Sequence, residues 1–115
     1  MISLRNRVQL IGNLGNDPEI KELDNGKKVA RFSIATNDSY KNAEGEKIAS
    51  TQWHNVVAWD TNASIAERFL KKGREVAIEG RLMHRSYDDS EGITKYITEI
   101  IVNEILLLNN GTRDK

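Results

Sequence analysis

Residues 47–60 place the strongest constraint on the fold, because both tryptophans of the chain lie in this stretch, six positions apart. Successive side chains of a strand point to opposite faces, so this even spacing predicts that Trp53 and Trp59 share one face of a long strand. A strand with two large rings on one side is either part of a hydrophobic core or a platform for a flat ligand. Burial statistics for tryptophan favour the core by about three to one.

Period-two alternation of apolar and polar residues predicts further strands on both sides of this stretch. They cover residues 4–14, 28–37, 74–87 and 93–108, with a short connecting strand or strand extension at 19–23. Phe32 and Ile34 are predicted to point into the core. Residues 38–49 are polar, and we predict a long hairpin loop there that is mobile without a ligand.

One segment departs from the strand pattern and predicts the single helix of the chain, over residues 61–72. Its apolar residues at helical spacing are Ile65, Ala66, Phe69 and Leu70. We assign the Phe69 ring to the core. The candidates for the N-terminal cap are Thr61, Asn62 and Ser64. Gly73 provides the expected stop.

The order of these elements is three strands, one helix and two strands. This order is typical of an all-β, five-stranded Greek-key barrel with one helix between strands three and four, the OB-fold. An open sheet with one helix is the competing architecture. We expect one domain over residues 1–108, followed by a short polar end at residues 109–115.

Composition limits the possible function classes. The 17 basic and 17 acidic residues give a net charge of zero, so a strongly basic nucleic-acid binder is disfavoured unless its charges cluster. The absence of cysteine excludes disulfides and thiolate metal sites, and two histidines make a histidine-rich site improbable. No apolar run is long enough to span a membrane and no signal-peptide pattern is present, so we expect an intracellular protein without membrane association, metal or cofactor.

Four aromatic residues fall outside the predicted core: Tyr40, Trp53, Trp59 and Tyr87. Basic residues accompany them, and we expect these to contact phosphates: Lys28, Arg31, Lys41, Lys47, Lys72, Arg74, Arg81, Arg85 and Lys95. Unpaired bases expose flat apolar faces, and stacking a ring on one contributes about 1–3 kcal/mol. Cations that neutralise phosphates make such binding salt-dependent. The pattern therefore indicates binding of single-stranded nucleic acid with little sequence preference.

Structural explanations compete with this interpretation for several residues. Tyr96 is expected in the core or at an interface. His54 faces away from Trp53 and is better explained as structural or as part of a subunit contact than as catalytic. Lys72 and Arg74 also fit the solvated basic end of a helix. The acidic pairs of the chain lie in predicted loop tips, where rigid support for acid–base or metal chemistry is missing.

Several short motifs follow one another in a characteristic order over residues 6–108. They are VQLIGNLGNDPE at 8–19, NG at 25–26, ARFSIAT at 30–36, TQWHNVV at 51–57, LKKG at 70–73, VAIEGRL at 76–82 and YITEI at 96–100. In sequence and spacing they resemble the bacterial single-stranded DNA-binding protein family, the homotetrameric type with an OB-fold. Each motif is weak alone, but their combined order is highly specific.

The resemblance implies that bases stack at Tyr40, Trp53, Trp59 and Tyr87. Family members often carry tryptophan at the positions of Tyr40 and Tyr87, and phenylalanine at that of Trp59. The resemblance further implies a homotetramer whose subunit contacts include the first strand and the region of one histidine, hence Val8, Leu10 and His54. It also implies protection of single-stranded DNA during replication, recombination and repair, in the cytoplasm and associated with the nucleoid.

The end of the chain departs from the family pattern. Family members usually continue into a Gly/Pro/Gln-rich linker and an acidic tip that recruits replication and repair enzymes. Residues 109–115 contain neither, which puts such recruitment in question. One alternative is a primosome-type OB-fold accessory dimer that acts mainly through protein contacts. Another is a small nuclease, but the sequence shows no convergent carboxylates for a divalent metal, and we expect a non-enzymatic protein.

Overall fold

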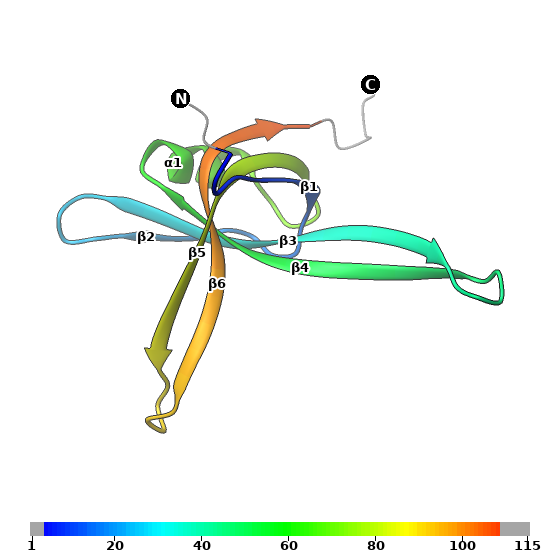
Figure 1. The fold of residues 1–115 in the computed structure, drawn as a ribbon. Helices are drawn as coiled ribbons and strands as arrows, with labels where there is room; N and C mark the ends of the chain where they lie inside the picture. Colours follow the sequence, from blue (N-terminus) through cyan, green and yellow to red (C-terminus); the bar gives the residue numbers. More distant parts are fainter. Residues whose placement is uncertain (1–3, 109–115) are drawn as a thin grey trace.

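The computed structural model describes residues 4–108, so the polar end predicted at residues 109–115 lies outside the described residues. Six strands and one helix are described in this part of the chain (Figure 1). They are β1 (Val8–Leu14), β2 (Glu19–Glu22), β3 (Lys28–Lys41), β4 (Lys47–Trp59), α1 (Thr61–Phe69), β5 (Glu75–Asp88) and β6 (Thr94–Leu107).

Five of these strands close into a barrel. Neighbouring strands follow the order β1–β5–β6–β4–β3, and β3 returns to β1 by pairing Ala35 with Asn13 and Ile34 with Leu14. The β4–β6 pair is parallel, while the other pairs are antiparallel. β2 pairs with β3 outside this ring. The closed barrel, with its helix between the third and fourth barrel strands, confirms the OB-fold prediction, and the open sheet is wrong.

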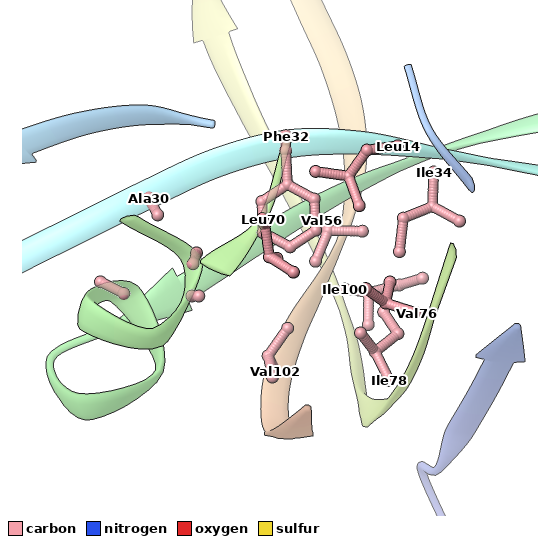
Figure 2. Packing of buried hydrophobic residues seen from close by; sticks show 13 residues of the cluster. Leu14, Ala30, Phe32, Ile34, Val56, Leu70, Val76, Ile78, Ile100 and Val102 are labelled. Carbon is pink, nitrogen blue, oxygen red and sulfur yellow. The ribbon is translucent and has the colours of Figure 1, made fainter. Parts of the chain in front are cut away.

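Alternate residues of the barrel strands point inward and form the core (Figure 2). The buried cluster consists of Leu14, Ala30, Phe32, Ile34, Val56, Ala58, Ala63, Ala66, Leu70, Val76, Ile78, Ile100 and Val102. Phe32 and Ile34 lie in it as predicted. Each barrel strand therefore has an inner face committed to packing, and the following residue points out of the barrel.

Gly12 lies where β1 passes from β5 to β3. It is paired with Val76 of β5, and a Cβ at this position would overlap the carbonyl oxygen of Ala35 and the side chain of Ile34. Barrel closure brings the two backbones together here, so only a residue without a side chain fits.

The helix α1 packs with its small residues, since Ala63 and Ala66 are fully buried. Its predicted end at residue 72 and the core assignment of Phe69 are both wrong. The helix ends at Phe69, and Leu70 takes an extended conformation with φ −100° and ψ 139°. This turn of the backbone sends Leu70 into the core and leaves Phe69 44% exposed, with the Arg68 guanidinium carbon 5.3 Å from its ring centroid.

The N-terminus of α1 also differs from the prediction. Asp60 is the N-cap, at φ 53°, and its side chain makes no capping hydrogen bond. Thr61 and Ser64 lie within the helix. The Asn62 side chain instead donates to the carbonyl oxygens of Val102 and Asn103, at 3.4 and 3.3 Å, and so ties the helix to β6.

The β3–β4 and β5–β6 hairpins extend from the barrel as long arms in different directions, and the shorter β2–β3 hairpin extends in a third (Figure 1). The β3–β4 arm is paired as far as Lys41 and Lys47, and the β5–β6 arm as far as Asp88 and Thr94. The long loop predicted for residues 38–49 is therefore wrong, because the connection covers only residues 42–46. Its tip is ordered by Asn42, whose Oδ1 accepts from the backbone N–H groups of Glu44 and Glu46, each at 2.9 Å.

Candidate nucleic-acid interface

The outward-pointing residues of β3, β4, β6 and β5 form one continuous surface, which we call the aromatic face. Strand register links its members: Trp53 lies opposite Ala35, Asn55 beside Glu99, and Tyr87 opposite Lys95. The aromatic face is defined by Arg31, Trp53, Asn55, Trp59, Arg81, Arg85, Tyr87, Ile97 and Glu99. It joins rings and guanidinium groups that are distant in the sequence.

The rings of this face are open to solvent. Trp53 is 63% exposed, Tyr87 is 47% exposed and Trp59 is 37% exposed. Burial in the core, the explanation that competed for both tryptophans, is therefore wrong. Large rings outside the core can stack on a flat ligand without disturbing the barrel.

Trp53 rests on the chain segment that follows β1. A Cβ on Gly15 would overlap the Trp53 ring and the Ser33 hydroxyl, so the ring lies directly against the Gly15 backbone. Asn16 fixes this segment, because its Oδ1 accepts from the Ser33 N–H at 2.9 Å and from the Ser33 Oγ at 2.8 Å. The Asn16–Ser33 hydrogen bonds thus fix the Gly15 backbone against which the ring packs, and we call this backbone the seat of Trp53.

A buried carboxylate lies at the centre of the aromatic face, and sequence analysis did not identify it. Glu99 is 4% exposed, and it is the one buried charged residue within residues 4–108. Arg31 Nη1 lies 2.6 Å from its Oε2, while Arg85 Nε lies 2.9 Å from Oε1 and Arg85 Nη2 lies 3.2 Å from Oε2. A glutamate inside the apolar run of residues 97–102 was the available signal, since a buried acid requires cationic partners.

These contacts shift the ionisation of the three side chains. The hydrogen bond from Arg85, and then that from Arg31, lowers the pKa of Glu99 despite its burial, which acts in the opposite direction. The same hydrogen bond raises the pKa of Arg85. The Arg85 guanidinium carbon also lies 5.8 Å from the Tyr87 ring centroid, within the range of a cation–π contact. Arg85 therefore connects the buried acid to an exposed ring.

A groove of about 230 Å³ lies over this cluster. Its lining residues are Asn16, Glu19, Arg31, Phe32, Ser33, Asn55, Val56, Arg85, Ile97 and Glu99. Guanidinium donors and apolar side chains meet in it, which suits a ligand that is anionic and partly apolar. Within the part of the chain that is described, no group of three or more His, Asp or Glu residues is placed to hold a metal ion.

Two aromatic residues lie apart from the aromatic face. Tyr40, a predicted stacking residue, is 58% exposed and opposes Ile48 far along the β3–β4 arm, on the face opposite to that of Trp53. Tyr96 opposes Ser86 in the β5–β6 arm and is 82% exposed, so the core alternative is wrong for it and the interface alternative stays a prediction. An arm two strands wide has no interior, and both of its faces meet solvent.

The predicted phosphate contacts are spread more widely than the rings. Arg31, Arg81 and Arg85 lie on the aromatic face, while Lys41 and Lys47 oppose each other at the end of one arm. Lys95 lies on the other arm, 4.0 Å from Asp89. Cations therefore lie both among the rings and on the two arms beyond them.

Three other predicted contacts lie near the helix. Lys28 pairs with Glu67 at 2.7 Å, and this hydrogen bond raises the pKa of Lys28. Arg74 donates to the carbonyl oxygens of Phe69 and Leu108, each at 3.5 Å. The Lys72 side chain is exposed beside it. Arg74 is thereby engaged in holding the end of α1, whereas Lys72 is open to solvent.

The predicted interface residues fall into two places. Val8 and Leu10 pack against the core from β1. Within the described residues, β1 pairs with β5 through residues 8–13 but with β3 only at Asn13 and Leu14, which leaves one edge of its first half unpaired. His54 Nε2 lies 3.0 Å from Thr36 Oγ1, on the opposite side of the β3–β4 arm from Trp53.

Comparison with known proteins agrees with this geometry. The Single-strand binding protein family matches residues 5–108. Single-stranded DNA-binding protein 1 of Chlorobaculum tepidum is 46% identical over 95% of this chain and 67% of its own length. The single-stranded DNA-binding protein of Neisseria meningitidis serogroup A is 40% identical over 90% of this chain and 59% of its own length.

A solved structure gives the same result. Superposition on the Plasmodium falciparum SSB in complex with ssDNA gives a TM-score of 0.83 at 36% identity, covering 95% of this chain and 99% of that one. The family match spans the whole barrel and the aromatic face. The chain belongs to the Single-strand binding protein family.

Proposed function

We propose that this chain binds single-stranded DNA with little sequence preference, by stacking bases on exposed rings and neutralising phosphates with neighbouring cations. The observation that carries the proposal is that Trp53 and Trp59 lie outside the core, on the same outer face as Arg31 and Arg85. The Plasmodium falciparum SSB, described in complex with ssDNA, shares this fold. Duplex DNA hides its base faces, and binding to it is expected to be much weaker.

The arrangement suggests how a strand would lie. Bases would stack on Trp53, Trp59 and Tyr87, while Arg81 and the outer donors of Arg85 contact phosphates. Tyr40 and the lysines of the arms would extend the path beyond the barrel, since both arms are exposed on two faces. Stacking accepts every base because each has a π-face, so sequence preference should be small.

A fluorescence titration tests this proposal. Addition of oligo-dT should quench the tryptophan emission of the chain, and added salt should release the oligonucleotide. Anisotropy of a labelled oligo-dT then gives the affinity of a Trp53→Ala, Trp59→Ala double variant. We expect this variant to bind at least about 10-fold more weakly, since stacking contributes about 1–3 kcal/mol per base.

The matched control is Phe69→Ala, which removes an exposed ring at the end of α1 that is not among the residues of the aromatic face. It should bind like the unaltered chain, and thermal unfolding shows whether each variant is folded. Unchanged affinity in the folded double variant would contradict stacking on these rings.

We also propose a homotetramer whose contacts include β1 and His54. Two features support self-association: the unpaired edge of β1, and the exposed Ile11 and Leu106, which lie beside a hollow of about 510 Å³ between β1, β5 and β6. Light scattering in solution measures the mass. A dimer that binds DNA weakly would instead favour the accessory, primosome-type role.

The biological role follows from binding. A coat on single strands would prevent re-pairing and nuclease attack during replication, recombination and repair, and such a role requires no catalytic group or cofactor. Within the described residues, no helix is long and apolar enough to cross a membrane. Incubation of labelled single strands with the protein and Mg²⁺ tests the non-enzymatic assignment, because progressive cleavage would contradict it.

A further inference from the structure

We propose that Glu99 is a positioning residue that acts as an internal counter-anion: it competes with DNA phosphate for Arg31 and Arg85, and so limits both the affinity for single-stranded DNA and its salt dependence. This inference rests on the proposed DNA-binding function. It assigns a role to an acidic side chain at the point where an anionic ligand would lie.

The first argument is geometric. Glu99 lies at the floor of the groove with a side-chain exposure of 5%, while the side chains of Arg31 and Arg85 above it are 46% and 41% exposed. Arg85 directs two donors to the carboxylate and Arg31 directs one. A guanidinium has five N–H donors, so each arginine keeps donors that can face a ligand in the groove.

The second argument is one of charge. The two arginines carry +2 and Glu99 carries −1, so these three residues present a net charge of +1. Glu19 also lines the groove but forms no ion pair with either arginine. Each phosphate neutralised on a single strand changes the slope of log affinity against log salt by about 0.7. With Glu99 present, the two arginines together should neutralise one phosphate. Without Glu99 they should neutralise two.

The third argument concerns the origin of the competition. Glu99 is bound by both arginines at short distances and its side chain is only 5% exposed, so its charge is less screened by water than one at an open surface. A phosphate that approaches Arg85 must share donors with a carboxylate of the same sign. Glu99 thereby holds both guanidinium groups in place and also lowers their attraction for phosphate.

The test compares Glu99→Gln with Glu104→Gln by titrating the full chain with labelled oligo-dT over a range of salt concentrations. Both variants remove one negative charge from β6, but Glu104 is exposed near the far end of the strand and makes no ion pair with Arg31 or Arg85. We expect the slope for Glu99→Gln to steepen by about 0.7. Its affinity should exceed that of the unaltered chain at low salt, and this advantage should shrink about 3.5-fold as salt rises from about 50 to 300 mM. Glu104→Gln should leave the slope unchanged.

A second pair of variants restores the charge balance. Its double variant removes one of the two cations that Glu99→Gln leaves without a carboxylate partner, so it serves where Glu99→Gln alone does not fold. Arg31→Gln alone leaves Arg85 neutralised by Glu99, whereas the double variant Arg31→Gln, Glu99→Gln leaves Arg85 free with a charge of +1. The double variant should have the slope of the unaltered chain and be steeper than Arg31→Gln by about 0.7.

Equal slopes for Arg31→Gln and the double variant would overturn the proposal, as would folded Glu99→Gln that binds more weakly with an unchanged slope. Either result would make Glu99 only a structural support for the two arginines. If the unaltered chain does not bind oligo-dT at all, the proposed function itself is wrong and this inference is wrong with it.

Discussion

The two faces of the barrel strands differ in what they allow. Arg31 and Phe32 are consecutive in β3, yet the first lies on the aromatic face and the second is 4% exposed inside the barrel. The inner face is closed on all sides, so a change of volume there must be absorbed by neighbouring atoms. The outer face borders solvent, so its side chains are free to meet a ligand. Stability and binding can therefore be altered separately, one residue apart.

The outer face is not uniform along its length. Val29, Val57 and Ile101 form a second buried cluster on it, and Val29 opposes Trp59. Trp59, at this end, is 37% exposed, whereas Trp53 is 63% exposed. The contrast between faces is thus weakest near Trp59, whose ring borders a small apolar cluster. Trp53 offers the larger free surface for stacking.

The largest expected effect is the loss of stability on truncating a side chain of the inner face. Phe32→Ala should lower the free energy of unfolding by about 3 to 5 kcal/mol, because it leaves a cavity in a closed core. The exposed ring of Phe69 provides the comparison, since Phe69→Ala opens no cavity. Chemical denaturation measures both variants, and oligo-dT titration measures binding below the transition.

Because Phe32 also borders the groove over Glu99, the affinity of folded Phe32→Ala for oligo-dT should fall a few-fold, much less than that of the Trp53→Ala, Trp59→Ala variant. Equal losses of stability in Phe32→Ala and Phe69→Ala would show that the two positions do not differ in packing, against the burial described above.

A smaller effect on stability is expected at Gly12, near the end of β1, and an effect on binding at Gly15, just after it. Gly12→Ala should cost about 1–3 kcal/mol of stability by overpacking, because the added Cβ meets the backbone of Ala35. Gly15→Ala places its Cβ against the Trp53 ring instead. The ring can move into solvent, so this variant should keep most of its stability but bind oligo-dT more weakly.

Denaturation and titration of both variants test the separation. Tryptophan emission should also shift in Gly15→Ala, since the ring moves off its seat. If Gly15→Ala loses as much stability as Gly12→Ala and binds oligo-dT normally, then Gly15 supports the packing of the core and not the position of the Trp53 ring for binding.

The inner face was predictable from sequence, whereas the lengths of the elements were not. Alternation identified Phe32 and Ile34 as core because one face of each strand is buried. The same rule failed for residues 38–41, where both faces of the arm are exposed and a polar strand has the composition of a loop. Phe69 was misassigned because one residue of extended backbone ended the helix and sent Leu70 inward.

The shared face of Trp53 and Trp59 was predictable from sequence, whereas the place of Tyr40 and the pairing of the charges were not. Even spacing placed Trp53 and Trp59 on one face of β4. Only the closed barrel shows that this face is the outer one, so that both rings are exposed. The pairing of Arg31 and Arg85 with Glu99 joins β3, β5 and β6, and no local sequence pattern reports which strands become neighbours. Spatial pairing of charges depends on topology, which is why the buried acid was missed.

The smallest expected effect concerns one buried group of the outer face. The hydrogen bonds from Arg85 and Arg31 lower the pKa of Glu99 in the folded chain, while the ordinary value in an unfolded chain is about 4.3. The ionised carboxylate therefore stabilises the fold fully above that unfolded-state value. This contribution is lost as the pH falls through the lower, folded-state pKa.

Denaturation at a series of pH values should consequently show a constant difference in unfolding free energy between the unaltered chain and Glu99→Gln at neutral pH. Below about pH 4 this difference should shrink, because the carboxyl group becomes protonated in both states. Glu104→Gln controls for the loss of one negative charge from the same strand. A decrease of the same size in both comparisons would mean that overall charge, and not the contacts of Glu99 with the two arginines, governs this acid sensitivity.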